Sequence, residues 1–261
     1  MNSVIQPNTH SDTWSERTEG YTNDAIFKEG SDLFKLVALA RPTWSDICLD
    51  IGTGAGHTAA MLAKGTGRVL GLDPAEGMVR SAMAAHEGIG NLEFAYGFAH
   101  DTGVPNDSFD LITVRHAAHH FSNVPSFLKE VSRVLKPGGR VVIADEVTPN
   151  PEVDEWFDAL ERLRDPSHHR AYMMREWREY VNQSGLTWVV GDSETKLHID
   201  VNSWLARANL SHEDRAAVYE HFLIASPEER SALKIKFEGD TAMSFELPVG
   251  MMLITKPFEE V

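Results

Sequence analysis

The 261-residue sequence contains a single cysteine, Cys48, which excludes a disulfide framework and a metal site built from several cysteines. It also lacks an apolar run of the roughly 18 residues that a membrane-spanning helix needs. Residues 1–19 do not show the basic and then apolar pattern of a signal peptide. We therefore expect a soluble, cytoplasmic protein without a membrane segment.

Basic residues are few relative to acidic ones. The chain has 24 lysines and arginines against 39 aspartates and glutamates, for a formal net charge of -15. Proteins that bind DNA or RNA neutralise phosphates with lysine and arginine, so this balance argues against a nucleic-acid partner. We expect a small-molecule substrate and a monomer or homodimer.

What the sequence does contain is a glycine-rich turn between an apolar strand and a helix. Asp50 ends the strand, and Gly52, Gly54 and Gly56 alternate with other residues behind it. A second apolar strand then ends in Asp73. Glycines let the backbone approach a ligand closely, and an acid at the tip of the next strand can accept both ribose hydroxyl protons. The pattern predicts an adenosine-bearing cofactor at the carboxyl edge of a parallel sheet.

Two cofactor types fit a turn of this kind. Residues 54–59 match the G-x-G-x-x-A pattern of dinucleotide sites. However, the run is spaced D-x-G-x-G-x-G, and Asp50 would repel a pyrophosphate at the helix N-terminus. Asp50 can instead reach the amino group of S-adenosylmethionine, directly or through water. An ordinary strand-to-helix turn would explain one or two of the glycines but not all three.

The hydrophobic pattern alternates strands and helices up to Glu146. We expect strands at 46–51, 68–73, 92–96, 109–115 and 140–146, with helices at 58–64, 75–86 and 124–135 between them. Such alternation predicts a doubly wound parallel sheet. Beyond it we expect helices at 149–163 and 170–184, a strand near 187–191, helical residues 202–237 and a hairpin-like final strand at 243–255, of which 251–255 is the last part. The corresponding division is an N-terminal disordered arm (1–20), a core with an N-terminal helical cover (21–146) and lid insertions with the last strands (147–261).

Four motifs carry a family resemblance: residues 50–56, residues 71–74 with Met78, residues 104–110, and residues 130–139. With them the chain resembles the class I S-adenosylmethionine-dependent methyltransferases, nearest the small-molecule branch that includes the ubiquinone and menaquinone C-methyltransferases. The resemblance implies a Rossmann-like, seven-stranded, mostly parallel sheet with an antiparallel last strand and a helical cover over the active site.

The resemblance also implies a set of cofactor contacts. These are Tyr21, Asp50, Gly52, Thr53, Gly54, Asp73, Pro74, Met78, Phe98, Ala99, Arg115 and His116. The chain departs from the family at Phe98, where an aspartate usually binds the adenine amino group. Phe98 can pack on the adenine face instead, and the Ala99 backbone can still pair with the ring. Asp101 is a substitute if the loop is shifted.

Histidines follow the fourth strand, where ligands sit in open α/β sheets. His119 and His120 are candidates for a general base, because histidine titrates near neutrality. Either could instead cap the following helix or bind a buried carbonyl. Asp165, His168 and Arg170 could hold the substrate or form a solvated loop. We predict no metal site, since the chain has no H-x-E or H-E-x-x-H spacing that supports one.

The predicted function is methyl transfer from S-adenosylmethionine to oxygen or carbon of a small molecule. A cyclase, decarboxylase or isomerase that retains the same cofactor is the alternative, because a fold does not fix a reaction. A non-catalytic binding module is a third possibility, and the intact glycine motif argues against it.

Overall fold

The computed structural model of the protein describes Trp14 and residues 25–258. Apart from Trp14, the expected N-terminal arm (1–20) lies outside the described residues, and so does the expected cofactor ligand Tyr21. Within the described residues, no helix has the length and apolar character needed to cross a bilayer.

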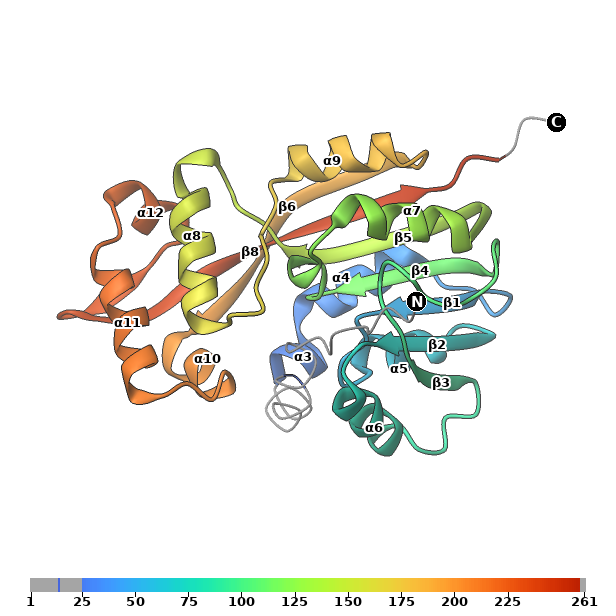
Figure 1. Ribbon diagram of the computed structural model, residues 1–261, viewed down its shortest axis with the longest axis horizontal. Coiled ribbons are helices and arrows are strands. Elements are labelled where there is room, and N and C mark those ends of the chain that lie inside the picture. The colour runs from blue at the N-terminus through green and yellow to red at the C-terminus, as the bar shows by residue number, and fades with distance from the viewer. Residues whose placement is uncertain (1–13, 15–24, 259–261) are drawn as a thin grey trace, which may run out of the picture.

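One eight-stranded sheet organises the described residues (Figure 1). Its strands are β1 (Ile47–Ile51), β2 (Arg68–Asp73), β3 (Leu92–Tyr96), β4 (Phe109–Arg115), β5 (Leu135–Glu146), β6 (Thr187–Asp200), β7 (Lys236–Glu238) and β8 (Thr241–Thr255). The order is β3-β2-β1-β4-β5-β8-β6, and β7 pairs with β8 off this path. β1 to β5 are parallel, whereas β8 is antiparallel to β5 and β6. The predicted architecture is confirmed, with the short β7 as an eighth strand.

Helices cover both faces of the parallel strands. They are α3 (Ala25–Glu29), α4 (Ser31–Ala40), α5 (His57–Ala63), α6 (Glu76–Ala85), α7 (Val124–Val134) and α9 (Met174–Gln183). In β1, Cys48 belongs to the core that contains Leu36 of α4, whereas Leu49 and Ile51 belong to the core that contains Phe127 of α7. Successive residues of the strand are thus buried on opposite faces of the sheet. Because both faces are covered, these strands are apolar almost throughout.

The sheet has a switch point between β1 and β4. These strands are neighbours although β2 and β3 lie between them in the chain, so their following loops depart in opposite directions. A crevice outside the carboxyl ends of the strands is the usual ligand site in such a sheet. The loops after β1 and β4 are the segments that carry the glycines and the histidines.

The last two long strands extend well past the parallel core. The final strand expected at 243–255 begins at Thr241, close to the prediction. The strand expected at 187–191 continues to Asp200, so that prediction was too short. It stopped before the charged residues Asp192, Glu194 and Lys196, which lie on the exposed face of β6, whereas Leu197 and Ile199 are buried on the other face. The helix expected from Arg170 begins at Met174, and the 202–237 stretch is broken into three helices and β7.

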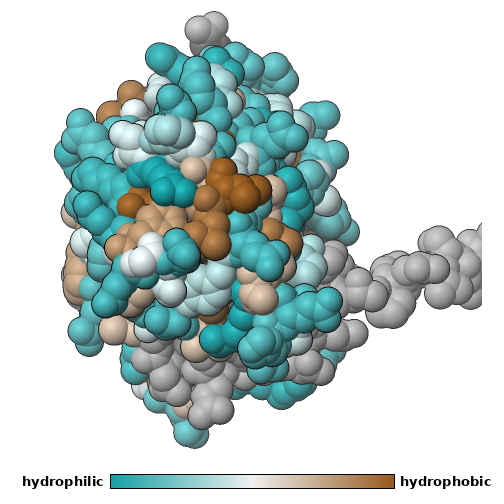
Figure 2. All heavy atoms as spheres, turned by 90° about the vertical axis from the view of Figure 1, so that its left-hand side faces the viewer, coloured by the Kyte–Doolittle hydropathy of each residue, from teal (hydrophilic) through white to brown (hydrophobic). Residues whose placement is uncertain are grey.

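These extended strands carry a separate helical end of the molecule, at the left of Figure 1. It comprises α8 (Pro151–Arg164), α10 (Val201–Arg207), α11 (His212–Leu223) and α12 (Pro227–Ala232). Trp204 of α10, Phe222 of α11 and Phe245 of β8 pack there ring against ring. Figure 2 faces this end and shows apolar atoms gathered near the middle of a mostly polar surface.

Candidate active site

A cavity of about 290 Å³ lies at the carboxyl edge of the sheet and reaches the helical end. Its size is close to the lower limit for small-molecule sites. The lining comes from the loops after β1, β2, β3, β4 and β5, from the N-terminal helices, and from α8, α10, β6 and β8. The predicted residues in this lining are Gly52, Thr53, Gly54, Asp73, Pro74, Met78, Phe98, Ala99, Arg115, His116, His119 and His120.

The glycine loop adopts a backbone that other residues resist. Gly52 and Gly54 have φ of 67° and 52°, in the left-handed region that favours glycine. A Cβ on Gly52 would collide with Ala117, whereas a Cβ on Gly54 would meet no described atom within 4 Å. Gly52 is therefore required for packing between the two loops, and Gly54 leaves open space toward the cavity.

Asp50 lies behind this loop rather than in the cavity lining. Its two carboxylate oxygens accept hydrogen bonds from the hydroxyls of Thr53 (2.7 Å) and Thr113 (2.6 Å). Burial raises the pKa of Asp50 to about 6, and the hydroxyl donors offset only part of this. In the described structure Asp50 positions Thr53, and its predicted contact with the cofactor amino group stays a prediction.

Asp73 does line the cavity, at the tip of β2. Its oxygens accept N–H bonds from Gly54 (2.8 Å) and Ala75 (2.9 Å), and each oxygen has a further lone pair for a ligand hydroxyl. Burial raises the pKa of this carboxyl to about 6, because its partners are uncharged N–H groups. Pro74 and Met78 continue the wall beside it.

The loop after β3 brings Phe98 and Ala99 to the cavity, together with His100. Phe98 contacts the rings of Tyr96 and His100, at centroid distances of 5.3 and 5.7 Å. Asp101, the expected substitute for the missing aspartate, is exposed and is not among the described lining residues.

Arg115 and His116 join the cavity to the N-terminal helices. Both contact the buried Asp32 of α4, Arg115 through Nε and His116 through Nε2 at 3.0 Å. Arg115 also donates to the carbonyls of Ile26 (3.0 Å) and Phe27 (2.9 Å). Burial would raise the pKa of Asp32, but these two cationic partners outweigh it and hold the pKa below its usual range. The pair therefore anchors the helical cover as well as lining the site.

A turn after β4 (Ala118–His120) is held by Asp145 near the end of β5. The buried Asp145 accepts N–H bonds from Ala117 (3.0 Å), Ala118 (2.5 Å) and Glu146 (2.8 Å). Its Oδ1 also lies 2.6 Å from Nδ1 of His119. Four donors on one carboxylate fix the backbone of the turn and the orientation of the His119 ring.

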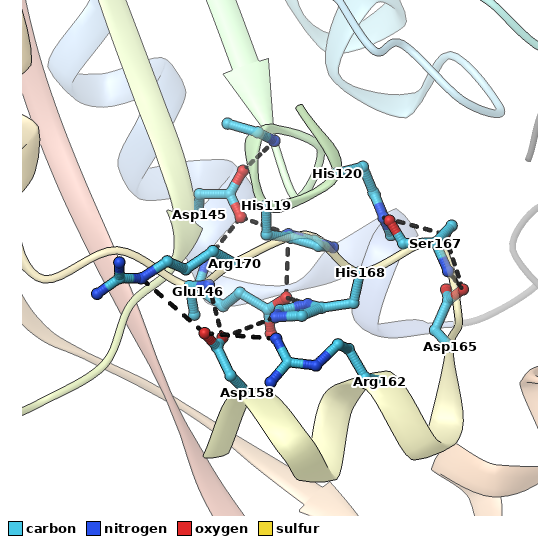
Figure 3. A network of polar contacts seen from close by, with 12 residues as sticks. His119, His120, Asp145, Glu146, Asp158, Arg162, Asp165, Ser167, His168 and Arg170 are labelled. Atoms are coloured by element: carbon cyan, nitrogen blue, oxygen red, sulfur yellow. Dashed lines mark hydrogen bonds and ion pairs between the residues drawn. The ribbon is translucent and has the colours of Figure 1, made fainter. Parts of the chain in front are cut away.

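Glu146, the residue after Asp145, gathers two histidines around one carboxylate oxygen. Its Oε1 lies 3.1 Å from Nδ1 of His119 and 3.4 Å from Nδ1 of His168, and Nε2 of His168 lies 2.9 Å from Asp158 of α8. Figure 3 shows the two imidazoles one above the other, with Glu146 against both. Burial lowers the pKa of each histidine, but the carboxylates outweigh it, raising the pKa of His119 and raising that of His168 to about 10.

His120 is paired differently. Its Nδ1 donates to the Ser167 carbonyl at 3.1 Å, and the Ser167 hydroxyl donates to Asp165 at 2.7 Å. A carbonyl can only accept, so Nδ1 of His120 carries the proton and Nε2 has a free lone pair when the ring is neutral. Burial and the neighbouring His119 charge lower the pKa of His120 to about 3. The pKa values of the two adjacent histidines therefore shift in opposite directions.

The three residues predicted to bind substrate lie outside the described lining of this cavity. Asp165 accepts hydrogen bonds from the N–H and the hydroxyl of Ser167, and despite burial these donors together with Arg164 hold its pKa below its usual range. His168 is buried in the Glu146 cluster, with its ring facing Asp158. Arg170 pairs with Asp154 (2.8 Å) and Glu176 (3.1 Å), and so ties the segment to α8 and α9. Their substrate role remains a prediction.

Sequence reasoning missed several lining residues. Glu146 ends a strand at the carboxyl edge, a position that could have identified it. Glu161 and Arg164 of α8 and Trp204 of α10 had no comparable signal in the sequence. The periodicity of a helix indicates its buried face but not which of its residues line a cavity. Glu161 is buried, and burial beside the negative Glu146 raises its pKa to about 8. Its Oε1 has no hydrogen-bond partner among the described residues.

The cavity joins a nucleotide-type loop and the acid at the tip of β2 to a second compartment, which is lined by residues of α8, α10, β6 and β8. This arrangement is typical of an α/β enzyme with two substrates. Comparison with known proteins agrees. A family model described as a methyltransferase domain matches residues 49–143. The uncharacterized methyltransferase YcgJ of Bacillus subtilis is 36% identical over 230 residues, which are 87% of this chain and 90% of YcgJ. The crystal structure of YcgJ has a TM-score of 0.80 at 32% identity, covering 88% of this chain and 99% of that one.

A second relative is named for its substrate. The demethylmenaquinone methyltransferase of Clavibacter sepedonicus is 31% identical over 193 residues, 72% of this chain and 76% of that protein. The chain belongs to the S-adenosylmethionine-dependent methyltransferases of class I, as its sequence motifs predicted.

Proposed function

We propose that this methyltransferase binds S-adenosylmethionine in the loop-lined part of the cavity and methylates oxygen or carbon of a small molecule in the remainder. One observation carries the proposal: a single cavity joins Gly54 and Asp73 to the side chains of Leu197, Trp204 and Leu247 at the helical end. The cofactor supplies an electrophilic methyl group on a sulfonium. The open face of Gly54 and the remaining lone pairs of Asp73 fit its adenosine half.

The second compartment fits an organic acceptor with apolar surface. Its walls combine aliphatic and aromatic side chains with Glu161 and Arg164. Methyl transfer needs alignment of donor and acceptor and exclusion of water more than it needs a covalent intermediate. The name of the Clavibacter relative, a demethylmenaquinone methyltransferase, supports a small organic acceptor for this chain too.

Of the two candidate bases, the contacts favour His120, whose lowered pKa keeps the ring neutral but makes it a weak base suited to an acidic proton. Its Nδ1 is occupied by Ser167, which leaves Nε2 to take a proton from a hydroxyl or an acidic carbon. His119 instead keeps its Nδ1 between Asp145 and Glu146. In the proposed reaction His120 accepts the proton of the nucleophile, while the Glu146 cluster forms the polar wall beside it.

Thermal shift with purified protein tests the cofactor. S-adenosylmethionine and S-adenosylhomocysteine are expected to raise the unfolding temperature, and NAD is not; stabilisation by NAD alone would contradict the assignment. Incubation with methyl-labelled cofactor and a metabolite extract tests the reaction. Cofactor binding without label transfer to any metabolite would favour the alternative, a cyclase, decarboxylase or isomerase.

A further inference from the structure

The cluster of His119, Glu146 and His168 has the composition and the spacing of a metal site. One potential ligand atom from each of the three residues lies within 4.8 Å of the other two. Two of the separations, 3.1 and 3.4 Å to the same Glu146 oxygen, are close to the roughly 3.3 Å between ligands bound tetrahedrally at about 2.0–2.1 Å. The remaining separation, between the two histidines, is at most 4.8 Å, which is within reach of a shared ion after side-chain adjustment.

His168 is arranged as metal-binding histidines are. Its side chain is 1% exposed, and its Nδ1 has no hydrogen-bond partner among the described residues although it faces Glu146. Its other nitrogen lies 2.9 Å from the Asp158 carboxylate. A histidine that ligates through one nitrogen almost always donates from the other to a carboxylate, carbonyl or water, which fixes its tautomer and ring orientation. Asp158 supplies that outer contact here.

The charges around the cluster also suit a dication. Asp145, Glu146 and Asp158 surround the two imidazoles, and the nearest guanidinium nitrogens, of Arg162 and Arg170, are 3.7 and 3.9 Å from Asp158. Nδ1 of His119 also lies 2.6 Å from Oδ1 of Asp145, so an ion bound through this nitrogen would replace that hydrogen bond. Asp145 would keep its three backbone N–H donors.

We infer that His119, Glu146 and His168 bind a divalent transition-metal ion of the zinc type, with an open coordination position toward the cavity. Two imidazoles and a carboxylate suit zinc, iron or cobalt better than magnesium or calcium. Three protein ligands and an open position are the arrangement of catalytic rather than structural zinc sites. Binding at His119 and His168 displaces any protons on their ligating nitrogens to solvent.

The site also indicates a substrate class, and this part of the inference rests on the proposed function. Glu146 and His119 line the cavity itself, next to His120. An ion there would bind a hydroxyl or carbonyl oxygen of the acceptor and lower the pKa of the proton that His120 removes. The acceptor is accordingly an alcohol, a phenol or an enolisable carbonyl compound, not an amine or a thioether.

The absence of a metal motif in the sequence does not conflict with this inference. The three ligands come from the turn after β4, the end of β5 and the segment after α8, so no short spacing can encode them. The sequence-based prediction of no metal rested on local spacing alone.

Metal binding is tested on the full chain without an affinity tag and without cofactor. After chelator treatment, equilibrium dialysis against Zn²⁺ alone is expected to give one tightly bound ion per chain. Co²⁺ is expected to give the visible absorption of a low-symmetry site. Glu146→Gln and His168→Ala are expected to weaken Zn²⁺ binding at least 100-fold, and Asp158→Asn by about 10–100-fold. The matched control is His169→Ala, an exposed neighbour, which is expected to bind as the wild type does.

The folding of each variant is checked before its metal binding is interpreted. Circular dichroism reports folding, and if His168→Ala fails to fold, Glu146→Gln and Asp158→Asn carry the test. No Zn²⁺ or Co²⁺ binding by the wild type would overturn the inference, and so would equal binding by wild type and Glu146→Gln, which would place the ion at another of the 12 histidines. Methyl transfer without metal binding refutes this inference alone, whereas metal binding without methyl transfer refutes the proposed reaction alone.

Discussion

Asp73 at the cofactor end of the cavity and Glu146 at the histidine end are both buried carboxylates, and their pKa values shift in opposite directions. At the cofactor end, burial raises the pKa of Asp50 and Asp73 to about 6, because their partners are neutral hydroxyl and N–H groups. At the histidine end, burial acts the same way on Glu146, but His119 and His168 outweigh it and lower the pKa.

The difference shows what each end still needs. A carboxylate surrounded by neutral donors can gain much from further ligand hydroxyls, so the cofactor end becomes satisfied on binding. Glu146 at the histidine end already faces two histidines. We therefore expect ligand binding to depend most on the first end and proton transfer to depend most on the second. Substitutions at the two ends are accordingly expected to have different effects.

The largest expected effect is on turnover at the histidine end. His120→Ala is expected to lower the turnover number about 10²–10⁴-fold, the usual contribution of a positioned proton acceptor. Cofactor affinity, measured by calorimetry, is expected to change little, since Ser167 and not the cofactor loop holds this ring. Near-wild-type turnover in the variant would remove the base role from His120.

The anchor of the helical cover is expected to dominate stability. Arg115→Met leaves the buried Asp32 without its guanidinium partner, and breaking a buried pair costs about 3–5 kcal/mol. Denaturant unfolding measures the loss. Lys136→Met is the control: it removes a partly exposed pair with Asp110, for which at most about 1 kcal/mol is expected. Equal losses in both variants would contradict a special role for the buried pair.

At the cofactor end, Asp73→Ala is expected to weaken S-adenosylmethionine binding by tens of fold. Hydrogen bonds to a charged group contribute about 1.5–3 kcal/mol each, and about 1.4 kcal/mol is a factor of ten. Calorimetry at neutral pH checks the value. An unchanged affinity would show that Asp73 does not hold the ribose.

The raised pKa of Asp73 predicts a pH dependence of cofactor affinity. The carboxylate form, which accepts the ribose hydroxyls, dominates above a pKa of about 6 and is lost as pH falls through it. We expect constant affinity between pH 7 and 8 and roughly tenfold weaker binding at about pH 5. Asp73→Asn is expected to flatten this dependence, and a slope that persists in the variant would assign it to another group.

The smallest expected effect concerns the glycine loop. Gly54 has a φ of 52°, in the left-handed region, so a residue with a Cβ there costs about 1–2 kcal/mol. Gly54→Ala should lose both stability and cofactor affinity. Gly88→Ala, at φ 87° and equally open space, should lose stability only.

The sequence predicted which residues meet at the glycine loop, because their positions depend on local patterns. Gly52, Gly54 and Asp73 are separated by one helix and one strand, so the strand-helix alternation and the glycine spacing place them at the same edge of the sheet. At the histidine end, the sequence placed His119 and His120 after β4, as the structure has them. It did not predict that Asp165, His168 and Arg170 lie outside the described cavity lining, and their role in substrate binding stays a prediction.

By itself, then, the sequence determined the doubly wound sheet, the family and the loops that meet at the cofactor. Apolar periodicity and backbone conformation are properties of neighbouring residues, so a linear pattern records them. Only the tertiary structure decided which acids face which histidines. Glu146 meets His119 and His168 because β5 ends beside the turn after β4, and because the chain after α8 returns over that turn through N–H bonds from His169 and Arg170 to the His119 carbonyl. Contacts between such distant segments depend on packing in three dimensions, and no spacing along the chain encodes them.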